Sequence, residues 1–210
     1  SLGTAFKAPT FNELYYPKTG SYVGNPDVQP ETALNREIAL HYETGSQAVS
    51  LTWYRNRIED MIVWAKVGPL NQPSNVDTAR IEGATLAWQG RMGDFNLQAS
   101  YDWLDAEDAN TGKQLTRRAK HTGEFAIGQN IGSWDWRVEW LASSKRYDDK
   151  ANTTELGGYA LTHLYGAYRF APDWSVFARV NNLFDKDYVL ADGYATPGRN
   201  AFIGVRYSPK

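Results

Sequence analysis

The chain has 210 residues and a formal net charge of −2, with 22 Lys and Arg against 24 Asp and Glu. This balance of charge argues against a general nucleic-acid binder, because such a protein needs a basic surplus. It has no cysteine, which excludes disulfides, thiolate metal sites and a cysteine nucleophile. A hydrophobic content of 42% excludes wholesale disorder, and no apolar run approaches the ~20 residues of a membrane helix.

The strongest local pattern is period-two alternation of apolar and polar side chains, which is typical of strands with two different faces. In residues 134–140, for example, three tryptophans and a valine alternate with Asp135, Arg137 and Glu139. Pro, Gly and Asn interrupt every candidate helix, so the chain is predicted to be all-β. We expect residues 1–5 to end a first strand, and further strands to cover residues 32–43, 47–60, 77–89, 94–105, 117–128, 134–146, 157–170, 174–184 and 198–207.

Short turns and long loops alternate between these strands. Short turns are expected at residues 44–46, 90–93, 129–133 and 171–173, and long polar loops at residues 6–31, 61–76, 106–116, 147–156 and 185–197. The strands are long enough to cross a bilayer at a tilt, and this asymmetry of the connections is typical of outer-membrane barrels. The sequence therefore predicts the wall of a transmembrane antiparallel β-barrel, with short periplasmic turns and long extracellular loops. The alternative, a soluble sandwich, has no reason to alternate its loop lengths.

Alternation also predicts which side chains face lipid. The apolar set expected to face the bilayer is Phe95, Leu97, Trp136, Val138, Val176 and Ala178. The polar set expected to face the lumen is Asn96, Gln98, Arg137, Glu139 and Arg179. Aromatic rings near strand ends are expected to form interfacial girdles rather than a sandwich core, and they are Tyr42, Trp88, Tyr101, Trp103, Trp134, Trp140, Tyr168 and Trp174.

Several motifs are similar to those of one known family. Residues 181–188, Asn-Asn-Leu-Phe-Asp-Lys-Asp-Tyr, together with Gly193-Tyr194 and Pro197-Gly198-Arg199, resemble the C-terminal signature of TonB-dependent outer-membrane receptors. Further matches are Phe6-Lys7-Ala8-Pro9, Gly24-Asn25-Pro26, Trp53-Tyr54-Arg55-Asn56 and Arg117-Arg118-Ala119-Lys120-His121. Together they extend over essentially the whole chain, and they look most like the cobalamin (vitamin B12) transporter branch.

The resemblance implies a twenty-two-stranded barrel in the outer membrane of a Gram-negative bacterium, filled by an N-terminal plug that carries the TonB box. Residues 1–210 would be the C-terminal part of that barrel domain, about ten strands, with the plug and TonB box absent. The implied function is TonB-energised uptake of a bulky nutrient, with cobalamin first and a siderophore or haem as the alternative. An outer-membrane barrel enzyme and a soluble β-rich binding module are more remote alternatives.

No catalytic residues are expected, because the chain has no G-x-S-x-G or H-E-x-x-H motif and its three histidines, His41, His121 and His163, fall on different predicted strands. No cofactor or metal site is expected either. The acidic runs beginning at Asp105 and Asp148 lack the alternating ligands of a calcium loop and are interpreted as solvated.

Two groups of side chains are candidates for binding. Aromatic residues on exposed loops bury a large area at low entropic cost, and the candidates for contact with the nutrient are Tyr15, Tyr16, Tyr22, Trp64, Tyr147 and Tyr194. Charged side chains expected in the lumen are candidates for hydrogen bonds and ion pairs with the plug, and they are Glu37, Arg137, Glu139 and Arg179. The alternatives for any one of them are loop packing and simple solvation. The expected partners are TonB, outer-membrane lipid and the nutrient, and nucleic acid is not among them.

Overall fold

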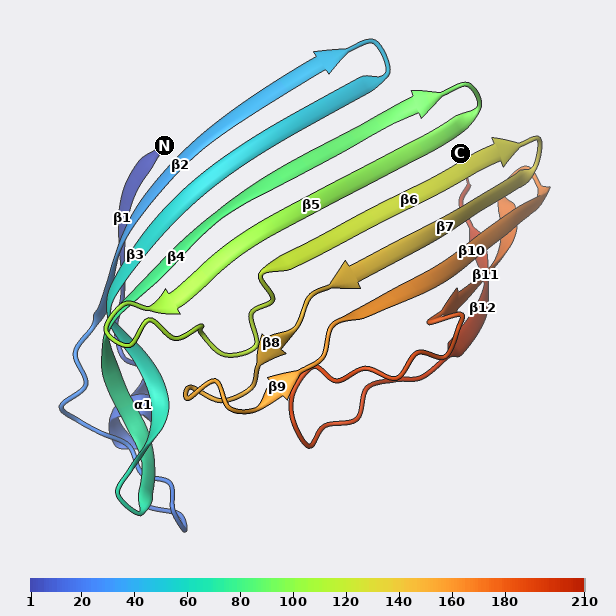
Figure 1. Ribbon diagram of the computed structural model, residues 1–210. Helices are drawn as coiled ribbons and strands as arrows, with labels where there is room; N and C mark the ends of the chain where they lie inside the picture. The colour runs from blue at the N-terminus through green and yellow to red at the C-terminus, as the bar shows by residue number, and fades with distance from the viewer. Residues whose placement is uncertain (210) are drawn as a thin grey trace. The chain divides into compact units, whose positions relative to one another are not determined.

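The computed structural model describes residues 1–209, with side chains for residues 1–75 and 78–209. Ten strands form one sheet in the order β1-β2-β3-β4-β5-β6-β7-β10-β11-β12, and β8 and β9 form a separate pair (Figure 1). The strands are β1 (Leu2–Lys7), β2 (Glu31–Thr44), β3 (Gln47–Val67), β4 (Leu70–Met92), β5 (Phe95–Asp108), β6 (His121–Ile131), β7 (Trp134–Ser143), β8 (Arg146–Tyr147), β9 (Glu155–Leu156), β10 (Tyr159–Ala171), β11 (Trp174–Asn181) and β12 (Asn200–Tyr207). The predicted all-β fold with one antiparallel sheet is confirmed, and the sheet is open, as expected of part of a barrel.

The four short turns that the sequence predicts are present. Residues 45–46, 93–94, 132–133 and 172–173 each connect two strands in two residues. The backbone of Gly45 has φ +54° and that of Gly132 has φ +59°, a left-handed conformation that favours glycine at the first position of a two-residue hairpin. These glycines therefore allow the strands to reverse at once.

The predicted loop at residues 61–76 is wrong, because β3 continues to Val67 and β4 already begins at Leu70. The two strands form a long hairpin that turns at residues 68–69. Residues 61–65 are a run of apolar side chains without alternation, so the period-two criterion does not detect this part of the strand. The hairpin matters for the site because it carries Trp64.

One short helix, α1 (Phe11–Tyr15), lies inside the loop predicted at residues 6–31, where no helix was expected. Thr10 caps it: its Oγ1 accepts a hydrogen bond from the backbone N–H of Glu13 at 3.2 Å, and the Glu13 carboxylate accepts one from the backbone N–H of Thr10 at 2.6 Å. This reciprocal capping box satisfies two backbone donors that a helix leaves free. Among the described residues, no helix is long and apolar enough to cross a membrane.

The contacts divide the chain into two compact units. Unit 1 comprises Ser1–Ile38, Trp53–Gly83 and Asp105–Leu115, and unit 2 comprises Ala39–Thr52, Ala84–Leu104 and Thr116–Lys210. Among the described residues, the buried side chains of unit 1 are Val28, Ile62, Pro73, Ala79 and Ala106. Those of unit 2 are Ala126, Ser143, Arg146, Leu156, Leu161, Thr162 and Asn182.

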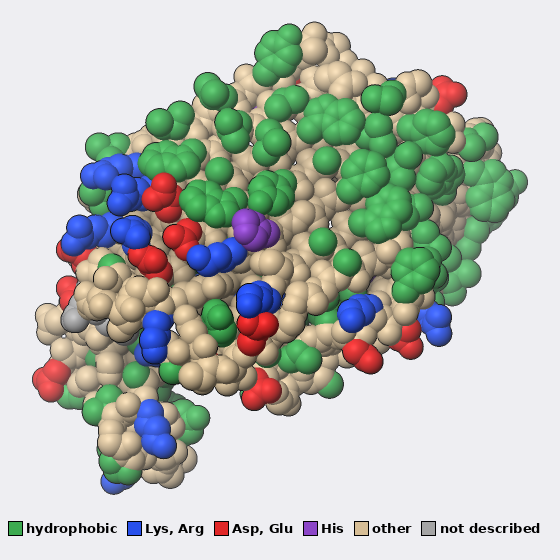
Figure 2. All heavy atoms as spheres, viewed as in Figure 1, with side chains coloured by type: hydrophobic (Ala, Val, Ile, Leu, Met, Phe, Trp, Pro, Cys, Tyr) green, Lys and Arg blue, Asp and Glu red, His purple; other side chains and the backbone are tan. Residues whose placement is uncertain are grey.

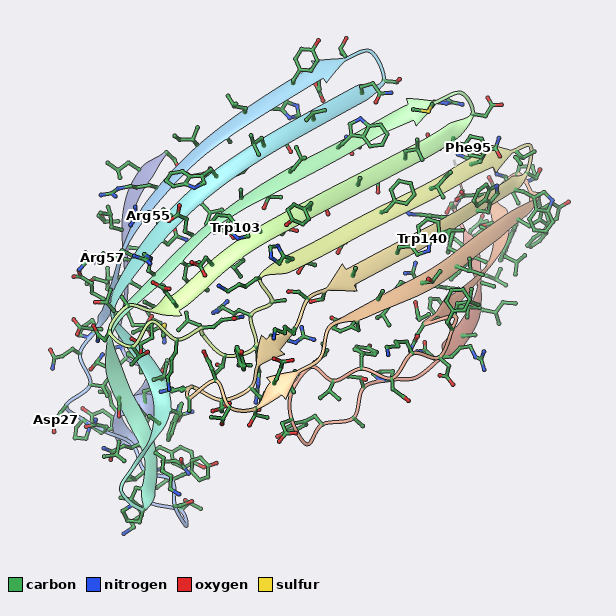
Figure 3. All side chains as sticks on the ribbon, in the orientation of Figure 1. Asp27, Arg55, Arg57, Phe95, Trp103 and Trp140 are labelled. Carbon is green, nitrogen blue, oxygen red and sulfur yellow. The ribbon has the colours of Figure 1, made fainter. Side chains whose placement is uncertain are left out.

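The two faces of the sheet in unit 2 follow from the register. Val138 is paired with Ile127 on β6 and with Leu164 on β10, so the three apolar side chains lie on one face. Aromatic pairs continue this face, with ring centroids 4.6 Å apart for Trp134 and Tyr168, 4.6 Å for Trp174 and Tyr207, and 5.4 Å for Phe125 and Trp140. Figure 2 shows apolar side chains gathered over β5, β6 and β7, and Figure 3 labels Phe95 and Trp140 among them.

The predicted alternation is confirmed on this sheet. All six residues expected to face lipid share the apolar face by register, and the five polar residues expected in the lumen share the other. An exposed apolar face of this extent is unusual for a soluble domain and typical of a surface covered by lipid or protein.

Candidate functional site

The polar face of unit 2 carries a group of charged side chains centred on Glu139. Register places Glu139 on β7 opposite His163 on β10, and Arg179 reaches it from β11. Arg137 Nε lies 3.0 Å from Glu139 Oε1, and Arg179 Nη2 lies 2.5 Å from Glu139 Oε2. One carboxylate therefore holds two guanidinium groups from different strands.

Polar neighbours extend this network. Arg137 Nη2 donates a hydrogen bond to Gln98 Oε1 at 2.5 Å, and Arg179 Nε donates one to Asn181 Oδ1 at 2.8 Å. The network lines a groove of about 630 Å³ that also includes His41 and Glu124. Arginines present several donors in a fixed geometry, so this groove can bind carboxylates and backbone carbonyls of another chain segment.

The structure brings together three of the four predicted lumenal residues: Arg137, Glu139 and Arg179. Glu37 lies on β2 in unit 1 and is not among the residues that line the groove. Of the three histidines, His41 and His163 line the groove. His121 lies on the apolar face instead, where its Nδ1 is 2.7 Å from the Tyr101 hydroxyl.

A cluster of aromatic side chains forms a second candidate site, in unit 1. The Trp64 ring lies with its centroid 5.9 Å from that of Tyr16, edge to face, and 6.1 Å from that of Tyr22. The strand segment at Tyr22 is held against the β3–β4 hairpin by hydrogen bonds from Val23 N to Asn71 O at 3.1 Å and from Asn71 N to Ser21 O at 2.6 Å. β pairing therefore orders the backbone around Tyr22 against the hairpin that carries Trp64.

The three rings remain open to solvent, with exposed fractions of 37% for Tyr16, 51% for Tyr22 and 41% for Trp64. Tyr15 is also exposed, but its ring packs on Phe11 of the same helix with a centroid distance of 5.2 Å. We call Tyr16, Tyr22 and Trp64 the aromatic cluster. Large rings that are held in place and exposed are suited to bind a bulky, partly apolar ligand.

The other two aromatic candidates, Tyr147 and Tyr194, belong to unit 2. The Tyr147 carbonyl accepts a hydrogen bond from the backbone N–H of Arg117 at 2.7 Å, and the side chain is half-buried at the end of β8. Tyr194 is 72% exposed in the loop after β11. Neither ring has an aromatic neighbour among the described residues, so these positions lack the packing of the aromatic cluster.

Charged contacts hold the loops of unit 2 together. Arg117 Nε lies 2.6 Å from Asp148 Oδ1 and Arg117 Nη2 lies 3.3 Å from Asp148 Oδ2. The Arg117 guanidinium holds the pKa of the Asp148 carboxyl below its ordinary value, and a backbone hydrogen bond from Asp192 acts in the same direction. In the neighbouring carboxyl, hydrogen bonds from the Thr154 and Thr153 backbone lower the pKa of Asp149.

Two residues that organise these loops were missed from the sequence. Arg146 is only 7% exposed; its guanidinium lies 5.1 Å from the ring centroid of Tyr159, and its Nη2 donates to the Val189 carbonyl at 3.2 Å. Asn182 is 3% exposed and bonds both backbone groups of Lys186, with Nδ2 to the carbonyl at 2.9 Å and Oδ1 from the N–H at 2.8 Å. Asn182 belongs to the family signature at residues 181–188. No local sequence pattern distinguishes the buried Arg146 from an exposed arginine.

The acidic loops use their carboxylates for turns. Asp108 Oδ1 accepts from the backbone N–H of Asn110 at 2.9 Å, and Asp149 Oδ1 accepts from Thr153 and Thr154. In the part of the chain that the structure describes, no three His, Cys, Asp or Glu side chains lie together as metal ligands. The acidic loops are therefore arranged as side-chain-capped turns.

Comparison with known proteins adds sequence relatives. A family model described as TonB dependent receptor-like, beta-barrel matches residues 1–183. The vitamin B12 transporter BtuB of Photobacterium profundum is 37% identical over 212 residues, which cover 99% of this chain and 34% of that protein. The vitamin B12 transporter BtuB of Vibrio vulnificus is 34% identical over 214 residues, with the same coverage. The chain thus spans about a third of the length of these curated relatives.

Solved structures share the fold. The copper transporter OprC matches 99% of this chain and 36% of its own, with a TM-score of 0.83 at 24% identity. The siderophore receptor PirA from Acinetobacter baumannii matches 98% of this chain and 38% of its own, with a TM-score of 0.79 at 19% identity. At these identities the likeness is one of fold alone. Because the family model matches residues 1–183 of the 210, the chain belongs to the TonB-dependent receptor β-barrel family of the Gram-negative outer membrane.

Proposed function

We propose that the chain is the C-terminal part of the barrel of an outer-membrane transporter that takes up cobalamin. The observation that carries this proposal is the 37% and 34% identity to two vitamin B12 transporters over 99% of the chain. The copper transporter OprC and the siderophore receptor PirA, at 24% and 19% identity, share the fold alone. The chain acts as a transporter wall and not as an enzyme.

Ligand contact is assigned to the aromatic cluster. A corrinoid presents a large, rigid and partly apolar surface, and stacked or edge-on rings can cover it without losing much side-chain freedom. Trp64 is central because both tyrosines pack on it. Tyr15, Tyr147 and Tyr194 are secondary candidates, since among the described residues none of them packs on the Trp64 ring.

The lumenal network is assigned to the plug. Glu139 neutralises Arg137 and Arg179 only in part, because one carboxylate faces two guanidinium groups. Both arginines line a groove that a plug segment with a carboxylate or free carbonyls can fill. TonB would act on the receptor through that plug, and Glu37 would contact it separately.

The proposal is tested by ligand titration of the full-length receptor in detergent, with cyanocobalamin, a ferric siderophore and haem as parallel ligands. Cyanocobalamin is expected to bind tightly and saturably. Trp64→Ala is expected to weaken binding about tenfold or more, since loss of one anchoring aromatic ring costs about 1.4–3 kcal/mol. The matched control is Trp134→Ala, an exposed tryptophan on the lipid-facing side.

Binding unchanged in Trp64→Ala would contradict the role of the aromatic cluster. Saturable binding of the siderophore or haem, without binding of cyanocobalamin, would assign the receptor to that alternative branch. Hydrolysis of a ligand that is abolished by replacing His41 and His163 would favour the barrel enzyme instead.

A further inference from the structure

An arginine on β2 lies on the face that elsewhere carries exposed apolar side chains. Arg36 is in phase with Ile38, which is exposed, and its partner on β1 is Leu2, which is exposed as well. Glu37, which lies between Arg36 and Ile38 in the sequence, points to the opposite face of the strand. Alternation therefore places Arg36 on the outer, lipid-facing side of unit 1 and not in the lumen.

Three more arginines share this side. Arg36 lines one groove of about 1080 Å³ together with Arg55 and Arg57 of β3 and Arg80 of β4, all within unit 1. Figure 3 labels Arg55 and Arg57, which follow one another on the same face of β3. The groove also contains the apolar side chain of Phe6. Guanidinium groups and apolar side chains thus meet on one surface.

The acidic neighbours of the groove neutralise only part of this charge. Arg57 Nε lies 3.0 Å from Glu59, Arg55 Nε lies 3.7 Å from Glu82, and Arg80 is paired with Glu107. Arg36 has no ion pair with another of the described residues. In these ion pairs three carboxylates meet three guanidinium groups, and Arg36 adds a fourth positive charge.

The paired arginines remain accessible to a further anion. Their side chains are 45% exposed for Arg55 and Arg80 and 65% exposed for Arg57. A guanidinium has five N–H donors, and a single contact with a carboxylate leaves several of them free. Exposed donors beside an apolar surface match the chemistry of a lipid, whose phosphate carries the charge and whose chains are apolar.

We propose that this groove binds the phosphorylated headgroup of an outer-leaflet membrane lipid. The phosphate contacts Arg36, Arg55 and Arg57, and the acyl chains run over the apolar side chains that continue the same face, such as Leu2 and Ile38. Binding is independent of the nutrient, because the groove lies on the outer face of the wall. It anchors the wall at a fixed depth at the end where the long loops begin.

The test uses the full-length receptor in phosphatidylcholine nanodiscs, titrated with phosphatidic acid, and bound lipid is counted by native mass spectrometry. Arg36→Gln/Arg55→Gln is expected to bind phosphatidic acid about thirtyfold more weakly than the parent, as expected for two lost headgroup contacts of about 1 kcal/mol each. The matched control is Arg91→Gln/Arg169→Gln, which removes the same charge from exposed positions near the short turns. This control is expected to bind as the parent does.

Equal binding by the first pair and the parent would overturn the proposal. Inorganic phosphate that displaces phosphatidic acid at comparable concentration would also overturn it, since the site would then recognise a free anion and not a lipid. A salt titration of the parent needs no substitution and covers the case of a variant that does not fold. Binding is expected to weaken between 50 mM and 500 mM salt because the groove is solvent-exposed, and affinity independent of salt would refute the role of the arginines.

Discussion

Replacing Asn182 by alanine is expected to loosen the loop that follows β11. The Asn182 side chain closes residues 182–186 by two hydrogen bonds to the backbone of Lys186, at 2.8 Å and 2.9 Å, and it is 3% exposed. Its backbone has φ +50°, a left-handed conformation that asparagine tolerates better than alanine. One substitution therefore removes two buried contacts and adds backbone strain.

The magnitude follows from these contributions. Each hydrogen bond contributes about 1 kcal/mol net, and alanine in the left-handed region costs about 1 kcal/mol more. The free energy of unfolding is therefore expected to fall by about 3 kcal/mol in Asn182→Ala. The loss is expected to be cooperative, because the backbone N–H of Asn182 also donates to His163 Nδ1 at 3.2 Å and connects the loop to β10.

The assay is urea unfolding of the full-length receptor in lipid vesicles, followed by tryptophan fluorescence. Asp187→Ala is the control, since Asp187 is an exposed residue of the same loop, and no resolvable change is expected for it. A loss below about 1 kcal/mol in Asn182→Ala would show that the side chain does not organise the loop, and the reasoning from its burial would be refuted.

Three further predictions concern the same unit. Asp148→Asn is expected to loosen the contact with Arg117 and lower the thermal midpoint at neutral pH. Because the pKa of Asp148 is lowered in the folded state, the parent's extra stability is present above the unfolded pKa of about 3.9 and is lost as the pH falls through the folded pKa. The difference in thermal midpoints between parent and variant should therefore vanish in acid. Gly128→Ala is expected to lower the free energy of unfolding in urea by about 1–3 kcal/mol, because a Cβ there would lie 2.6 Å from the Trp136 carbonyl oxygen. The control Gly166→Ala should be tolerated, because a Cβ there would have nothing within 4 Å. Equal effects of the two substitutions would contradict the register of β6 against β7. Glu139→Gln is expected to cost about 1–2 kcal/mol by weakening two charged hydrogen bonds. Glu155→Gln, whose carboxylate pairs with the exposed Lys145, should leave the midpoint unchanged.

The faces of the wall were predictable from sequence because alternation is a property of each strand by itself. Trp136, Val138 and their neighbours needed no partner to be assigned to a face, and register confirmed the assignment. Helix α1 was predictable in principle as well. Its Thr10-x-x-Glu13 capping box is a local signal, but the segment is short and lies between Pro9 and Pro17, which favour a loop.

Contacts between distant segments were not predictable. Trp64 meets Tyr16 and Tyr22 across more than forty residues of sequence, and the hairpin that carries Trp64 has no alternation at its apolar run. The burial of Arg146 depends on its packing against Tyr159 from another strand. The charge of Arg36 by itself favours the lumen, and only its phase with Ile38 and its register opposite Leu2 place it on the outer face.

The central claim is that this sheet is a membrane-spanning wall with one lipid face and one lumenal face. It is tested most directly by single-cysteine scanning of residues 134–140 on β7, in a chain that has no native cysteine. Spin labels are read in the full-length receptor in vesicles, against a lipid-soluble and a water-soluble relaxing agent. Labels at 134, 136, 138 and 140 are expected to respond to the lipid-soluble agent, and those at 135, 137 and 139 to the water-soluble one. Reversed parity, or no alternation along the strand, would contradict the account.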